Sequence, residues 1–128
     1  MKHIFYPSIP YERNEFADSD NHYNCPIVTS YPENIKNNID AIVNGEVDFM
    51  HPFLSFASED TISYRLVEEL GKKFDISDQE IHSAVHAAWE ELAACREDMR
   101  RKGEEVIKFL DETGNRGIVL AGRPYHID

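Results

Sequence analysis

The feature that most constrains the fold is a long amphipathic helix, predicted for residues 77–113. It begins with the capping box Ser77-Asp78-Gln79-Glu80, in which the serine hydroxyl and the glutamate bond each other's backbone amides. Apolar residues then recur at steps of four and three, the spacing of one helix face: Ile81, Val85, Ala88, Leu92, Cys95 and Met99. Gly114 is expected to end the helix. At 1.5 Å per residue the helix would exceed ~50 Å, so we expect it to bend near Gly103 or to link two lobes.

Upstream of this helix, short strand-like and helix-like segments alternate. Residues 2–6 predict a strand that Pro7 ends, and residues 7–24 predict an irregular polar loop. Residues 27–29 and 47–50 are short apolar runs typical of strands, and the segment between them has its isoleucines on one helix face. This strand–helix–strand order predicts parallel strands.

Two further elements complete the predicted fold. Ser58 is expected to cap a helix that ends near Gly71. Residues 117–121, Gly-Ile-Val-Leu-Ala, predict a buried strand, and the glycine-bearing turn after it normally leads into another helix. We therefore predict an α/β fold with a small, mainly parallel Rossmann-like sheet, flanking helices and one long C-terminal helix. Residues 1–128 form a single α/β domain or a fragment of a longer, two-lobed multidomain chain.

Charge and composition exclude several classes of function. The chain has 13 basic and 24 acidic residues, a net charge of −11, so nucleic acid and anionic membranes are poor partners. No apolar run approaches the ~20 residues that span a bilayer, and no signal peptide is visible. Two cysteines are too few for a disulfide scaffold. These features predict a cytoplasmic protein with free thiols.

Two groups of residues are candidates for chemistry. Cys25 lies in a polar loop, where a cysteine is either a metal or cluster ligand or a small apolar residue that starts a strand. Arg123, Tyr125 and His126 follow a predicted parallel strand, beyond which ligands bind in open sheets. The guanidinium of Arg123 suits a phosphate or carboxylate, and His126 exchanges a proton near neutral pH. The alternative is that these side chains brace a turn.

Two weaker candidates lie on the long helix. His82, His86 and Glu90 share one helix face and have donor types that suit zinc or nickel, although a solvated face is the simpler interpretation. Cys95 lies on the apolar stripe and is expected to be a core residue. The chain has no glycine-rich nucleotide-binding motif.

Two stretches of the chain resemble a known family. Residues 24–33, Asn-Cys-Pro-Ile-Val-Thr-Ser-Tyr-Pro-Glu, and residues 117–128, Gly-Ile-Val-Leu-Ala-Gly-Arg-Pro-Tyr-His-Ile-Asp, resemble a domain of acyl-CoA dehydratase activase-related proteins, also called CoA-substrate-specific enzyme activases. The order and spacing of the intervening helices match too, so the resemblance covers essentially the whole chain. In that family the domain is part of a longer polypeptide, whose other parts resemble the ATP-dependent activator of 2-hydroxyglutaryl-CoA dehydratase.

The resemblance implies an anaerobic, cytoplasmic electron-transfer system that acts on CoA thioesters. The domain is distantly similar to dehydratase subunits that hold a 4Fe–4S cluster, which implies that Cys25 is a cluster ligand. Such a cluster would be completed by residues outside this chain, since two cysteines are too few. Arg123, Tyr125 and His126 would line a site for a CoA-type ligand. The activator's ATP-binding residues are absent, so the chain is expected not to bind ATP and to be inactive alone.

Two hypotheses follow. In the first, the domain supports iron–sulfur-dependent electron transfer to acyl-CoA dehydration, with Cys25 at the cluster. In the second, it is a non-catalytic interaction module whose acidic surface docks a basic patch on an activase or dehydratase partner. The partners expected in either case are the remainder of the parent polypeptide and a dehydratase or activase subunit.

Overall fold

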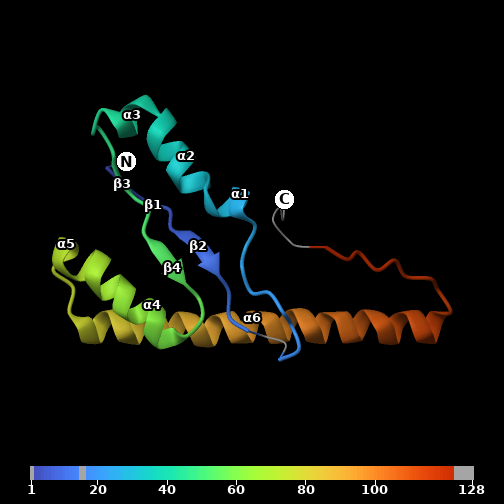
Figure 1. Cartoon of the computed structure of the whole chain (residues 1–128). Coiled ribbons are helices and arrows are strands. Elements are labelled where there is room, and N and C mark those ends of the chain that lie inside the picture. Colours follow the sequence, from blue (N-terminus) through green and yellow to red (C-terminus); the bar gives the residue numbers. More distant parts are fainter. Residues whose placement is uncertain (1, 15–16, 123–128) are drawn as a thin grey trace. The chain divides into compact units, whose positions relative to one another are not determined.

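The computed structural model describes residues 2–14 and 17–122, and the chain divides into two units. Unit 1 is Met1–Trp89 and unit 2 is Glu90–Asp128. Unit 1 contains the strands and the short helices, and the long helix α6 (Asp78–Thr113) has residues in both units (Figure 1). The small parallel sheets, the flanking helices and this long helix confirm the predicted α/β class.

Two parallel strand pairs form the sheets of unit 1. Strand β1 (His3–Phe5) pairs with β3 (Asp48–Met50), and β2 (Ser8–Tyr11) pairs with β4 (Phe53–Ser55). Parallel pairing requires a long crossover, and the helical segment between β2 and β3 supplies it. Parallel pairing is confirmed, but not between the predicted partners, because β3 pairs with β1 and not with residues 27–29. The prediction that residues 7–24 are an irregular loop is wrong at its start, because β2 lies there.

The predicted strand at residues 27–29 is wrong, because these residues belong to the short helix α1 (Pro26–Thr29). Pro26 stands at the helix start, where its fixed φ favours helix and its missing N–H is not needed. The Thr29 hydroxyl donates to the Cys25 carbonyl oxygen at 3.1 Å. Local proline and threonine chemistry therefore outweighs the β-propensity of these three β-branched residues.

The next predicted helix is divided into α2 (Tyr31–Asn38) and α3 (Asp40–Val43). Ile39 between them has an extended backbone, with φ −102° and ψ 114°. The Asn37 and Asn38 side-chain amides donate to backbone carbonyls four residues earlier at 2.7 Å each, and such bonds compete with the helix ladder.

Helix α4 (Glu59–Leu66) begins as predicted, because the Ser58 hydroxyl accepts from the Thr61 amide at 3.2 Å. It continues into a π-helical turn, η1 (Val67–Gly71), and then into α5 (Lys72–Phe74). The helical path ends at Asp75, whose φ of 53° is left-handed.

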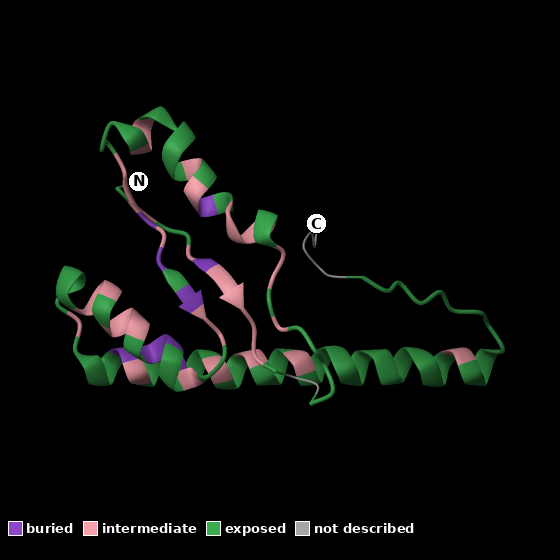
Figure 2. Cartoon of the chain, in the orientation of Figure 1, coloured by how far each residue is buried: buried purple, intermediate pink, exposed green. Residues whose placement is uncertain are grey.

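The core of unit 1 lies where β4, α4 and the first turns of α6 meet. It consists of Leu54, Ile62, Ile81 and Val85, with partly buried neighbours packed around them. Phe56 stacks on Trp89 with ring centroids 6.1 Å apart. The buried positions lie in β2, β3 and β4, in α2 and α4, in the N-terminal part of α6, and at Pro52 between β3 and β4 (Figure 2).

Helix α6 has 36 residues and begins at the predicted capping box, where the Ser77 hydroxyl accepts from the Glu80 amide at 3.2 Å. It ends before Gly114, whose φ is 67°, as a glycine C-cap predicts. The helix is continuous through Gly103. The predicted buried strand at residues 117–121 is wrong, because the segment is in no strand and its Ile118, Val119 and Leu120 are 93–97% exposed.

Candidate functional site

Cys25 lies in unit 1 directly before α1 and is partly buried. The chain on its N-terminal side is fixed by Asn24, whose side-chain amide donates to the Ile9 carbonyl and to Glu12 Oε1, at 2.9 Å each. A hollow of about 400 Å³ lies beside this segment, lined by Pro10, Tyr23, Asn24, Pro26, Thr29, Ser30, Glu33 and Phe53. Cys25 is therefore held in a defined backbone beside a mostly apolar hollow.

The described residues do not fit an iron–sulfur cluster of their own. Such clusters take about four ligands, mostly cysteine thiolates. In residues 2–14 and 17–122 no group of three or more histidine, cysteine or acidic side chains is arranged to hold a metal ion. The second thiol, Cys95, is in unit 2 and is exposed, which contradicts its predicted place in the core.

The proposed metal face of α6 is engaged in other contacts. His86 Nδ1 lies 2.9 Å from Glu59 Oε1 of α4, and the His82 ring packs edge-on against Tyr64 at 5.8 Å. Two of the three predicted ligands thus contact neighbouring side chains of unit 1. Together with the lack of a metal-binding group among the described residues, this argues against a zinc or nickel site here.

An electrostatic cluster that the sequence did not indicate surrounds Asp48, at the start of β3. Lys73 of α5 forms an ion pair with Asp48 Oδ2, and His3 Nδ1 of β1 lies 2.8 Å from the same oxygen. Two hydrogen bonds hold the pKa of Asp48 below its ordinary value of 3.8. The one from Lys73 has the larger effect and the one from His3 the smaller. These residues are far apart in sequence, and only the β1–β3 pairing and the α4–α5 path bring them together.

A second pair that the sequence did not indicate is His51 and Glu33. His51 Nδ1 lies 2.9 Å from Glu33 Oε1, and the imidazole is only 22% exposed. The His51 ring also stacks on Phe49, with centroids 5.8 Å apart. The pair links α2 to the residue that follows β3, next to the hollow beside Cys25.

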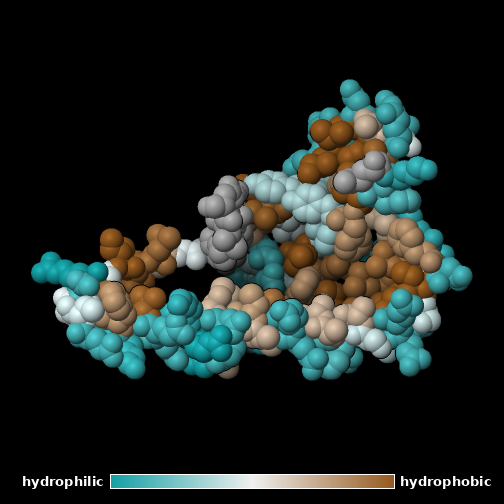
Figure 3. All heavy atoms as spheres, turned by 180° about the vertical axis from the view of Figure 1, so that it is seen from behind, coloured by the Kyte–Doolittle hydropathy of each residue, from teal (hydrophilic) through white to brown (hydrophobic). Residues whose placement is uncertain are grey.

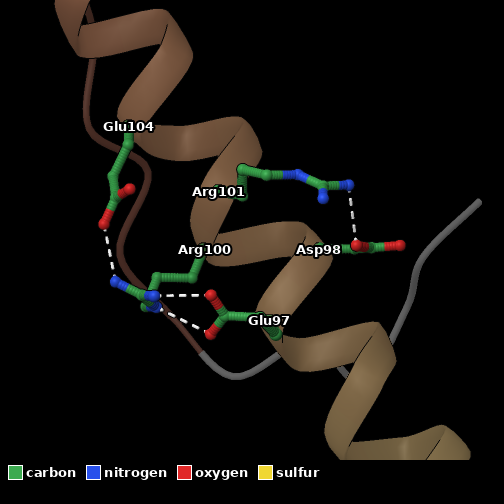
Figure 4. Close-up of polar contacts among 5 residues, drawn as sticks. All are labelled: Glu97, Asp98, Arg100, Arg101 and Glu104. Atoms are coloured by element: carbon green, nitrogen blue, oxygen red, sulfur yellow. Dashed lines mark hydrogen bonds and ion pairs between the residues drawn. The ribbon is translucent and has the colours of Figure 1, made fainter.

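The acidic residues of the two units differ in how far they are compensated. Unit 1 has 15 acidic and 6 basic residues, and unit 2 has 9 and 7, so the net charges are −9 and −2. Figure 4 shows three acidic residues of α6 in unit 2, Glu97, Asp98 and Glu104, each facing an arginine about one turn away. Arg100 contacts Glu97 and Glu104, the latter at 2.6 Å, and Arg101 Nη2 lies 2.8 Å from Asp98 Oδ1.

Many exposed carboxylates of unit 1 have no such partner. Eight of them are exposed and form no ion pair with any other described residue: Asp18, Asp20, Asp40, Glu46, Asp60, Asp75, Asp78 and Glu80. Uncompensated charge of one sign creates a potential that extends into solvent over a Debye length, roughly 8 Å at physiological salt. Unit 1 is therefore the source of the acidic field of this chain.

Comparison with protein families matches residues 1–128 to the CoA enzyme activase uncharacterised domain. The chain belongs to this family. The match includes both stretches on which the resemblance was based, and it confirms the activase-related assignment. No curated protein and no solved structure matches the chain.

Three of the predicted site residues of this activase domain lie outside the part of the chain that the structure describes. These are Arg123, Tyr125 and His126, the expected wall for a CoA-type ligand, so their role stays a prediction. Within the described ranges, no helix has both the length and the apolar character needed to cross a lipid bilayer.

Proposed function

We propose that this activase domain is a non-catalytic interaction module, which docks a basic surface of an activase or dehydratase partner. The observation that supports this most directly is the set of uncompensated exposed carboxylates in unit 1. No group of described side chains is arranged to hold a metal ion, and the pKa shifts found fall on exposed ion pairs rather than on a buried acid or base.

The charge difference between the units fits docking better than folding. Exposed ion pairs add little stability, ~0–1 kcal/mol each, and unpaired like charges repel one another. Across an interface, however, complementary charge increases the association rate and selects partners of opposite sign. A net charge of −9 on unit 1 therefore acts mainly on partner encounter.

The test uses binding kinetics to the ATP-dependent activator and to the dehydratase, measured separately by surface plasmon resonance. A triple variant removes three charges from loops of unit 1 by the substitutions Asp18→Asn, Asp20→Asn and Glu46→Gln. We expect the association rate at low salt to fall about 10-fold, and the difference to shrink at high salt.

The matched control removes three charges from unit 2 by Glu91→Gln, Asp111→Asn and Glu112→Gln. We expect at most a small change in rate for this variant. Equal effects of the two triple variants, a rate insensitive to salt, or no binding to either partner would contradict the proposal.

A second candidate function rests on Cys25. We infer that its thiolate serves as one ligand of an iron–sulfur cluster completed by residues outside this chain, in an anaerobic cytoplasmic system that delivers electrons to acyl-CoA dehydration. Cys25 is partly exposed at the end of an anchored loop. The adjacent apolar hollow would lower the local dielectric, which tunes such clusters. The CoA-type ligand would lie near Arg123, Tyr125 and His126.

The test is the iron and sulfide content of the complete activase polypeptide, purified without oxygen. Cys25→Ala is compared with Cys95→Ala, a thiol control in unit 2. Loss of iron in the Cys25 variant alone supports the ligand role. Equal iron in the wild type and both variants excludes Cys25 as an essential ligand.

A further inference from the structure

We propose that residues 117–121 add as a strand to the edge of a parallel β-sheet that a partner supplies, with the C-terminal part of α6 covering one face of that strand. The partner is a sheet edge with apolar faces, within the larger activase polypeptide. The proposal does not depend on the acidic docking of unit 1, because it concerns other residues and a contact without charge.

The sequence of the segment is typical of a central strand. Successive side chains of a strand point to opposite faces, so Ile118 and Leu120 belong to one face and Val119 and Ala121 to the other. Both faces are apolar, the pattern of parallel strands that are buried on both sides. An edge strand facing solvent would instead have charged residues, and residues 117–122 have none.

The structure leaves this segment without any of the contacts that its sequence requires. Ile118, Val119 and Leu120 are 96%, 93% and 97% exposed. No backbone hydrogen bond joins residues 117–122 to another described residue. Three consecutive exposed apolar residues with unpaired backbone groups form a template for strand pairing.

Within unit 2, the segment begins tightly against the helix. A Cβ built on Gly117 would lie 2.6 Å from Leu110 Cδ1, so a larger residue would require the Leu110 side chain to shift. A hollow of about 810 Å³ follows, with apolar lining from Met99, Val106 and Ile107 of α6 and from Ile118 and Val119. Figure 3 shows apolar atoms gathered at this end of α6. The helix, the short link 114–116 and the extended segment have the order of a helix–strand half of an α/β unit.

These features favour a sheet edge over a second copy of the chain. Two copies related by a two-fold axis would pair this segment antiparallel with itself. Such a pair has only two strands, which is marginal in water, and its apolar outer face would remain uncovered. An existing parallel sheet provides backbone partners and a covered second face at once.

The test is hydrogen–deuterium exchange of the amides of residues 118–121, in this chain at two concentrations and in the complete activase polypeptide. We expect no protection in the chain alone and at least about 100-fold slower exchange in the complete polypeptide. Protection that rises with chain concentration would indicate pairing with a second copy. Protection in the chain alone that does not depend on concentration would indicate docking within the chain. No protection in either the chain alone or the complete polypeptide would indicate a solvated segment. Each of these three results overturns the proposal.

A variant sharpens the result. Val119→Pro removes one amide from the expected ladder, whereas Val119→Ala keeps it. In the chain alone we expect both variants to melt as the wild type does. In the complete polypeptide we expect lower melting temperature and faster exchange with Val119→Pro and a smaller change with Val119→Ala. If the proline variant does not fold, the exchange of the wild type and the alanine variant decides. The proposed acidic docking is tested separately by its salt dependence, so the two proposals can fail independently.

Discussion

Unit 1 buries a small apolar core and leaves many of its charges uncompensated, whereas unit 2 has no buried described residue and pairs many of its charges along one helix. The helix nevertheless runs through both. In unit 1 its apolar face is covered by β4 and α4. In unit 2 the same face includes Met99 and Val106, 63% and 49% exposed. The same apolar face of the helix is thus packed into a core in unit 1 and exposed to solvent in unit 2.

The largest expected effect tests whether stability depends on the core of unit 1. Leu54→Ala removes a side chain that is 3% exposed and should lower the free energy of unfolding by ~2–5 kcal/mol. Ile107→Ala in unit 2, where the side chain is 61% exposed, should change it by less than ~0.5 kcal/mol. Urea unfolding followed by Trp89 fluorescence measures both. Similar losses for the two variants would remove the distinction between the units.

A smaller effect is expected at the two glycines around the last turns of α6. Gly103→Ala places a methyl in open space within the helix and should stabilise it by ~0.5–1 kcal/mol. Gly114→Ala forces a side chain onto a φ of 67° and should destabilise the helix end by ~1 kcal/mol. Amide exchange of residues 97–113 should slow in the first variant and accelerate in the second. If amide exchange changed in the same direction in both variants, helix propensity would not govern the stability of α6 in unit 2.

The smallest effect concerns the Asp48 cluster of unit 1. Its pKa is lowered in the native state, so the ionised carboxylate stabilises the fold above the unfolded-state pKa. That contribution disappears as the pH falls through the native pKa, below 3.8. We expect the NMR titration midpoint of Asp48 to lie below 3.8. In Lys73→Met we expect this midpoint to rise, because the donor with the larger effect on the Asp48 pKa is lost. A midpoint unchanged by this substitution would show that Lys73 does not act on Asp48 in solution.

The parts of the fold that depend on neighbouring residues could be predicted from the sequence. The capping box at Ser77, the repeating apolar steps and Gly114 are local signals, and they define α6 almost to the residue. The Ser58 cap is equally local. The strand predicted at residues 27–29 was wrong, because β-propensity is a weak preference and the local effects of Pro26 and Thr29 favour a helix.

The parts that depend on topology could not be predicted. His3, Asp48 and Lys73 meet only because β1 pairs with β3 and the α4–α5 path returns toward them. Residues 117–121 have the composition of a buried strand, yet composition does not supply the neighbouring strand that makes one. Cys25 is a partly buried thiol. A ligand set is a property of several segments at once, so the role of Cys25 as a cluster ligand stays a prediction.

The π-helical turn Val67–Gly71 between α4 and α5 has a rotational consequence. Each residue of an α-helix advances the chain by about 100° around the axis, and a π turn holds one residue more than an α turn. Deleting one residue there would restore an uninterrupted α-helix but would turn every later side chain by about 100°. Lys73 would then point away from Asp48. The chain after the left-handed residue Asp75 would also enter α6 in another direction. The extra residue acts as an angular spacer that sets where the longest helix of the domain begins.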